Sequence, residues 1–320
     1  MSAALIVFAT SLPALLLPHL LPLHRATPVT GALVWMLDLL LRAGVMVGAA
    51  TFAFVQLAHA EPVEAVLAWC WHEVLPDIPA WLGLAEHRVA HAAVLLPAVA
   101  VALVVMIESL TLVRGWIHQR RQLPADVAQG AVTTSVIADE HVVVAVTRIG
   151  RGRVLVSDRA LEVMDADELA AGLAHEAAHI RRRHRPVLLA ASLLAAIARP
   201  LPGTRTAERE LCFQLERDAD ADAVRRLQDP LSLASAICKA AEADPPGIAA
   251  SLAGRGPVTR RVAELLGESG APSRRVEISA RVLASAFAAL LLALAIAAPA
   301  SAVRAAAGDS PRAGHDCSHH

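Results

Sequence analysis

The stretch that decides the fold of the polar part of the chain is DADELAAGLAHEAAHIRRRH, residues Asp165–His184. Asp165 is followed three residues later by Glu168, which is a capping-box start for a helix. Apolar residues then recur at helical spacing, and Pro186 predicts that the helix ends before it. The stretch therefore predicts one amphipathic helix that carries two histidines on the same face.

Those histidines belong to His175-Glu176-Ala177-Ala178-His179, which has the pattern HExxH. Because His175 and His179 are one helical turn apart, both imidazoles can bind a single metal ion. Glu176 stands beside them, where a carboxylate can take a proton from metal-bound water. The pattern predicts a catalytic zinc site with Glu176 as general base, and its alternative is an exposed helix face without metal.

A catalytic zinc needs a third protein ligand and an open fourth position. A second helix is expected over about Ala207 to Leu227, and Glu216 on it is the predicted third ligand. Asp220 lies four residues further on, shares the face of Glu216 and is predicted to orient a ligand histidine. Asp218 and Asp222 stay open as alternative ligands.

His184 closes the quoted stretch and is not expected to bind the metal. The longer zinc-binding pattern with three histidines places its third histidine six residues after the second, and Arg185 stands at that position. His184 is therefore interpreted as an interfacial or substrate-side residue.

The composition around this stretch is that of a membrane protein. Of the 320 residues, 56% are hydrophobic and only 18% are charged, against about 25% charged in an ordinary soluble domain. The mean hydropathy is +0.50 and the net charge is −1. These values argue against a soluble enzyme and against disorder, and the absence of a basic field argues against a nucleic-acid partner.

The apolar residues cluster into segments long enough to cross a bilayer as helices. The first segment lacks the basic start and the cleavage site of a signal peptide, so we expect it to be retained. For the other apolar segments, the alternative interpretation is that they are core helices of a large soluble protein. A shorter apolar stretch, Val187–Ala198, is interpreted as a buried or re-entrant helix. The four predicted spans are Ala3–Leu21, Gly31–Leu57, Val89–Val113 and Val282–Ala298.

Arginine and acid counts predict the orientation of the spans. The loop 61–88 is acidic and is expected outside, whereas the arginine-rich segment 114–280 is expected in the cytoplasm. The predicted domains are a membrane region over 1–113, a metallopeptidase domain over 114–280 and a last span with a short outer tail over 281–320.

Two pairs of residues in or outside the spans are candidates for direct contacts. Asp38 and Arg42 are four residues apart in the second span and are expected to pair, either as a structural pair or as a polar site in the bundle. Cys70 and Cys317 would both lie outside the cell and could form a disulfide, but no metal-binding cysteine spacing is present.

Three short segments before the quoted helix predict a small antiparallel sheet, because they are rich in β-branched residues and are interrupted by glycines. The last of them is expected to bind an extended peptide by adding it as a strand. The segments are Ala131–Ala138, His141–Val146 and Arg153–Ser157.

Residues Arg153–His184 together with Glu216-x-x-Ala219-Asp220 resemble the integral-membrane gluzincin peptidases. Three spans before the catalytic segment and one after it are similar to the BlaR/MecR-type antirepressor metallopeptidases. HtpX-like and CaaX-protease relatives share the motifs but arrange their spans differently. The resemblance implies a gluzincin-like α+β domain and zinc as cofactor, with His175, His179 and Glu216 as ligands, Glu176 as base and Asp220 behind the ligands.

Two departures from the family limit what the resemblance implies. About twenty residues follow the last span, so no penicillin-binding sensor domain and no direct β-lactam sensing are expected. Relatives also have a His-Pro element ahead of an Arg-Ile or Arg-Val pair, and this histidine is missing here. Arg255, Arg260 or Arg261 is a candidate to stabilise the oxyanion instead, and the alternative is that these arginines pair with acids or lipid phosphates.

The sequence as a whole predicts a mainly α membrane protein with about four spans and a zinc endopeptidase domain at the cytoplasmic face of a bacterial membrane. By resemblance, the expected substrate is a cytosolic transcriptional repressor. A housekeeping quality-control membrane protease is the enzymatic alternative. The second alternative is a non-proteolytic membrane receptor with a structural zinc. A structural site has no use for a base beside the metal, so Glu176 argues against this alternative.

Overall fold

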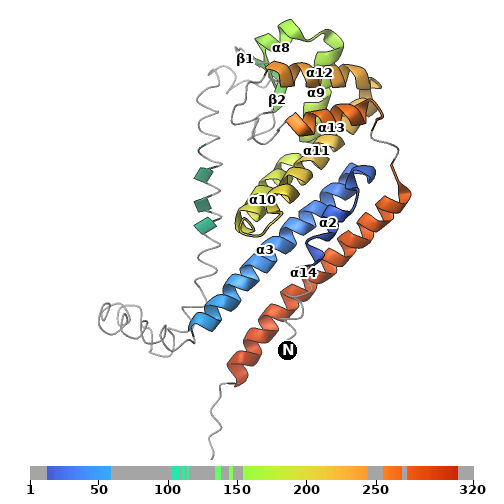
Figure 1. Ribbon diagram of the computed structural model, residues 1–320. Coiled ribbons are helices and arrows are strands. Elements are labelled where there is room, and N and C mark those ends of the chain that lie inside the picture. The colour runs from blue at the N-terminus through green and yellow to red at the C-terminus, as the bar shows by residue number, and fades with distance from the viewer. Residues whose placement is uncertain are drawn as a thin grey trace, which may run out of the picture.

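The computed structural model describes residues 13–58, 154–243, 255–268 and 272–308, two strands before residue 154 and isolated residues between 103 and 114. A group of short helices and strands lies at one end of a body of long helices (Figure 1). The helices are α2 (Leu17–Leu20), η1 (Leu23–Arg25), α3 (Pro28–Ala58), α8 (Asp158–Val163), α9 (Ala166–Arg181), α10 (His184–Ile197), α11 (Thr204–Leu227), α12 (Pro230–Ala243), α13 (Arg255–Leu265) and α14 (Arg274–Gly308).

The helix predicted from the quoted stretch is α9, and its start has the predicted capping box. The Asp165 carboxylate accepts hydrogen bonds from the backbone N–H groups of Asp167 and Glu168, and the Glu168 carboxylate accepts one from the N–H of Asp165. Glu168 also accepts hydrogen bonds from Ser235 and Lys239 of α12. The cap thus ties the start of α9 to a neighbouring helix.

Helix α11 connects the two ends of the molecule, since it packs on α9 near one end and along α3 and α10 elsewhere (Figure 1). At Gly31 of α3 an added Cβ atom would lie 2.6 Å from Gln214 Oε1 of α11. Glycine therefore leaves the space that the buried Gln214 side chain occupies, and a larger residue at this position would displace that side chain.

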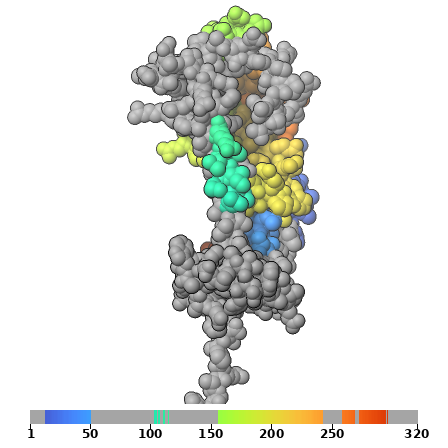
Figure 2. All heavy atoms as spheres, turned by 90° about the vertical axis from the view of Figure 1, so that its left-hand side faces the viewer, coloured from blue at the N-terminus to red at the C-terminus, as the bar shows by residue number. Residues whose placement is uncertain are grey.

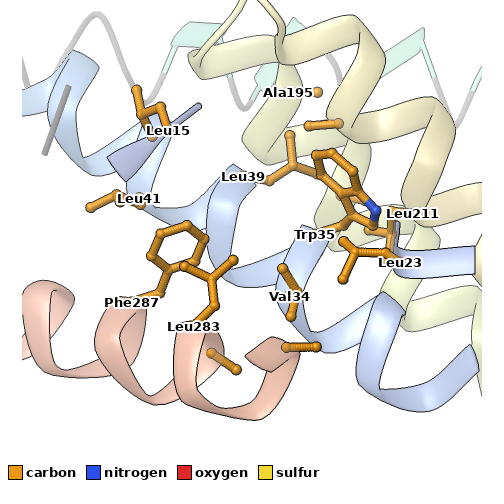
Figure 3. Packing of buried hydrophobic residues seen from close by; sticks show 14 of the residues in the cluster. Leu15, Leu23, Val34, Trp35, Leu39, Leu41, Ala195, Leu211, Leu283 and Phe287 are labelled. Carbon is orange, nitrogen blue, oxygen red and sulfur yellow. The ribbon is translucent and has the colours of Figure 1, made fainter. Parts of the chain in front are cut away.

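The main hydrophobic core holds α3, α10, α11 and α14 together. Trp35 and Leu39 of α3 lie against Leu211 and Ala195, while Leu283 and Phe287 of α14 cover the other side of α3 (Figure 3). Figure 2 shows the side chains of α10 and α11 (yellow) on one face of the molecule, next to those of α3 (blue). The core therefore joins the long apolar helices to the helix that carries Glu216.

Two described helices are long and apolar enough to cross a membrane, Pro28–Ala50 and Arg274–Ala293. They correspond to the second and fourth predicted spans. The first predicted span does not continue as a helix to Leu21, because the chain breaks into the short α2 and η1 around three prolines, and its start lies outside the described residues. Most of Val89–Val113, and both Cys70 and Cys317, also lie outside them.

The predicted pair in α3 forms and has a structural role. Arg42 Nε donates to Asp38 Oδ2 over 2.7 Å. The two remaining guanidinium nitrogens donate to the carbonyl oxygens of Pro202, over 2.5 Å, and Leu15, over 2.8 Å. Arg42 therefore fastens the α10–α11 connection and the start of the chain to α3, which favours structural pairing over a polar site.

Three short strands pair in the order β1 (Thr134–Ile137), β3 (Val154–Ser157) and β2 (Val144–Val146). Strand β2 is antiparallel to β3, whereas β1 is parallel to it, so the prediction of a purely antiparallel sheet was wrong. Apolar alternation identifies a strand but carries no information on its direction. Because β3 lies between the other two strands, it has no edge to which a peptide could be added, contrary to the prediction for Arg153–Ser157.

Candidate metal centre

The structure brings together the three side chains that the sequence singles out as ligands. His175 and His179 of α9 face Glu216 of α11 where the two helices pack. The Nε2 atoms of the two histidines are 3.1 Å apart. Each lies close to one Glu216 oxygen, at 3.3 Å for His175 and 3.4 Å for His179.

These distances fit a tetrahedral zinc ion. Zinc binds imidazole nitrogen and carboxylate oxygen at about 2.0–2.2 Å, so two ligand atoms of a tetrahedron lie roughly 3.3–3.5 Å apart. The two histidine nitrogens, 3.1 Å apart, and the Glu216 oxygen nearest to each of them, at 3.3 and 3.4 Å, are close to that separation. Two nitrogens with one oxygen form a donor set that catalytic zinc uses. This group can therefore hold a zinc ion with one position left open.

Behind His175 lies the carboxylate of Asp220, whose Oδ1 atom is 2.8 Å from His175 Nδ1. Asp220 in turn accepts two hydrogen bonds from Arg261 of α13, of 2.8 and 2.7 Å. The same guanidinium reaches Glu216, with Nη1 2.9 Å from Oε2. Arg261 thus positions both the candidate ligand Glu216 and the residue that orients His175.

The charges at the site keep its carboxylate ionised. Burial raises the pKa of Glu216, but the positive charge of Arg261 and the contacts with both histidines outweigh it, and the pKa of Glu216 lies well below its usual range. Burial lowers the pKa of His179 to about 4, so this imidazole is neutral at pH 7. An ionised carboxylate and a neutral imidazole are the forms that bind metal.

His175 behaves differently because two acids face it. Burial lowers its pKa, but the interactions with Asp220 and Glu216 prevail and raise the pKa to about 10. Without metal the site therefore carries a proton on His175. His175 would have to lose this proton to serve as a metal ligand, since histidine binds metal in its neutral form.

Glu176, the predicted base, follows His175 on α9 and is partly buried. Its negative charge contributes to raising the pKa of Arg261, which also grips Glu216. The carboxylate is therefore within electrostatic range of the group formed by the candidate ligands, on the helix that supplies two of them.

The other candidate residues have different partners. Arg260 pairs with Glu210 and lies over the ring of Phe213, with 3.8 Å between the guanidinium carbon and the ring centroid. Arg255 opens α13, and its side chain lies outside the described residues. Of the two arginines whose side chains are described, Arg261 lies at the site, where it contacts carboxylates, and Arg260 pairs elsewhere.

Neither alternative ligand faces the metal group. Asp218 contacts His184 and Arg182. The Asp222 carboxylate is surrounded by arginines, whose hydrogen bonds lower its pKa below the usual range. These arginines are Arg181, Arg182, Arg225 and Arg226.

His184 is the site residue that the sequence analysis misjudged. Its ring is only 4% exposed and lies behind His179, with 2.9 Å between the two Nδ1 atoms. It is buried, so the interpretation as an interfacial residue was wrong. Helix α9 ends at Arg181, and Arg183 adopts a left-handed conformation with φ of 55°, so the chain turns His184 back toward His179. The spacing count assumed a continuing helix.

Arg217, next to Glu216, is a second residue that the sequence analysis missed. It donates to the carbonyl oxygen of His24 over 2.6 Å and to Gln214 Oε1 over 2.7 Å, and it pairs with Glu264 of α13. The turn before α3 is therefore fixed to α11 directly beside a candidate ligand. Arg217 lies in a run of charged residues, and such runs usually face solvent, so the sequence pattern offered no reason to expect these contacts.

The group contains two histidines and one acid that could hold a metal ion, with a further carboxylate on the same helix as the histidines. These are the groups that a metallopeptidase uses. The sequence model of Peptidase family M48 matches residues 113–269, a segment that contains all of these residues. The match supports a zinc metallopeptidase of the M48 type. No curated protein and no solved structure matches the chain.

Proposed function

We propose that this chain is a membrane-embedded zinc endopeptidase that works at the cytoplasmic face of a bacterial membrane and cleaves a transcriptional repressor. The observation that carries the enzymatic part is the His175, His179 and Glu216 group with Glu176 beside it. Two apolar helices and the similarity to antirepressor peptidases support the membrane and regulatory parts.

In this proposal the two histidines and Glu216 hold zinc. Zinc supplies a Lewis acid that polarises the scissile carbonyl and lowers the pKa of the attacking water. Glu176 takes the proton from this water and later gives it to the leaving amine. Asp220 and Arg261 keep His175 and Glu216 in place.

The substrate is expected to bind beside β2 (Val144–Val146) and not at β3. Strand β2 is at an edge of the described three-stranded order and contacts α9, which carries the histidines. A peptide added at a sheet edge gains backbone hydrogen bonds and lies extended. At β2 its carbonyl groups would run past the candidate metal group.

The test is the substitution Glu176→Gln in the full-length protein in membranes. We expect proteolysis to fall by roughly 10²–10⁴-fold, the usual contribution of a general base, while zinc content stays at the wild-type level. Glu162→Gln is a matched control, because Glu162 is exposed on α8 and, among the described residues, pairs with Arg159 alone. Equal proteolysis by wild type and Glu176→Gln would contradict the proposal.

The same variant tests the substrate. An inactive protease retains the proteins that it would cleave, so proteins enriched with the Glu176→Gln variant over wild type identify its targets. A single repressor that is cleaved only in wild-type cells supports the regulatory role. A broad set of misfolded membrane proteins would contradict that role and indicate quality control.

A further inference from the structure

His184 and Asp218 form a buried pair behind His179 that the catalytic scheme above does not use. His184 Nδ1 lies 2.9 Å from His179 Nδ1, and His184 Nε2 lies 3.1 Å from Asp218 Oδ2. The side chains of His184 and Asp218 are only 4% and 9% exposed. The three groups therefore form a chain of contacts that leads from a carboxylate to a candidate metal ligand.

We propose that Asp218 and His184 position His179 by fixing which of its nitrogens carries the proton. The proton positions follow from the contacts. Ionised Asp218 can only accept, so the proton of His184 resides on Nε2 and its Nδ1 has a free lone pair. His179 must then donate from Nδ1, which leaves its Nε2 lone pair directed at Glu216 and the metal position.

The arrangement is built from two elements that meet at one turn. Arg182 and His184 lie on either side of the left-handed residue Arg183, and both reach Asp218, with Arg182 Nη1 3.2 Å from Oδ2. The guanidinium can only donate, so its contact uses Asp218 as an acceptor. A buried polar pair held from both sides has little freedom to adopt the other arrangement of protons.

The Asp218–His184 pair behind His179 corresponds to the contact of Asp220 with His175. Asp220 faces Nδ1 of His175 directly, whereas Asp218 acts on His179 through His184. Glu216, Asp218 and Asp220 are alternate residues of α11, so one helix supplies the third ligand and the carboxylates behind both histidines. Partners of this kind typically change metal affinity by about 10–100-fold.

The inference rests on the proposed function, because it concerns a residue proposed to bind zinc. It predicts the effect of Asp218→Asn, whose amide can donate to His184 Nε2 and so move the His184 proton to Nδ1. His179 would then have to accept at Nδ1 and carry its proton on Nε2, where the metal binds. An Asp→Asn change behind a catalytic histidine is known to impose the wrong tautomer in this way.

The experiment measures zinc affinity of the full-length protein by competition with a chelator, together with thermal unfolding. We expect Asp218→Asn and His184→Leu to bind zinc about 10–100-fold more weakly. His184→Asn keeps an acceptor oxygen near the Nδ1 position and should restore much of the affinity. Asp222→Asn is the matched control, since Asp222 is also buried on α11 but pairs only with arginines, and it should bind zinc like wild type.

The outcomes separate this inference from the proposed function. Wild-type affinity in Asp218→Asn and His184→Leu would overturn the inference and leave the peptidase proposal standing. Equal weakening in Asp222→Asn would also overturn it, because general destabilisation would then explain the loss. A wild-type protein that binds no zinc would overturn the proposed function itself.

Discussion

Glu216→Ala is expected to weaken zinc binding by more than about 100-fold, beyond the usual effect of losing a partner behind a ligand. The substitution removes the acid whose oxygens lie 3.3 Å from His175 Nε2 and 3.4 Å from His179 Nε2. Two imidazoles alone leave zinc with two protein ligands, fewer than a catalytic site needs. Chelator competition with the purified protein measures the affinity.

Glu210→Ala is the control for this prediction. Glu210 also lies on α11 and also pairs with an arginine of α13, Arg260, but it does not belong to the group of His175, His179 and Glu216. Its substitution should leave zinc affinity unchanged. Unaltered zinc binding in Glu216→Ala would show that another residue completes the site and would reject Glu216 as the third ligand.

Arg261→Met should produce the second large effect, a loss of about 3–5 kcal/mol in the free energy of unfolding of the metal-free protein. The guanidinium is 13% exposed and contacts the carboxylates of both Glu216 and Asp220. Without it, the buried Asp220 carboxylate and the half-buried Glu216 carboxylate lose the cation that contacts both of them. Chemical denaturation in detergent, with and without zinc, measures the change.

Zinc should reverse part of this loss, because its charge then lies beside the same carboxylates. Arg260→Met is the control, since Arg260 forms a partly exposed ion pair with Glu210 and such pairs contribute about 0–1 kcal/mol. Equal stabilities of metal-free Arg261→Met and Arg260→Met would contradict the positioning role of Arg261.

The local parts of the fold could be predicted from the sequence. Asp165 and Glu168 mark the start of α9 because a capping box involves residues three apart. The one-turn spacing of His175 and His179 likewise places both on one face of that helix. Such patterns depend on the geometry of a single helix, and the structure reproduces them.

The motif predicted that Glu216 of α11 meets the two histidines of α9, but other contacts between separate elements could not be predicted. The contact of Arg261 with Glu216 requires the position of α13 on α11, about 45 residues apart in the chain. His184 reaches His179 only because Arg183 adopts a left-handed conformation. Pro186 indicates that the helix ends nearby, but neither it nor a helical spacing rule anticipates the left-handed turn at Arg183.

The strand order and the path of the first apolar segment could not be predicted from the sequence pattern either. The alternation in Val154–Ser157 indicates a strand but not its neighbours, and the parallel pairing with β1 places it in the centre of the sheet. Hydropathy in the first segment hid the effect of its prolines, which divide the described part into short helical turns.

The most direct measurement of the central claim is a zinc titration of the metal-free protein, with bound zinc and peptide cleavage followed together. Cleavage is predicted to rise in proportion to bound zinc and to reach its maximum at about one zinc per chain, the stoichiometry of a single-metal site. Glu176→Gln should take up the same zinc without gaining activity. Full cleavage by the metal-free protein, or equal activity of Glu176→Gln, would contradict the account.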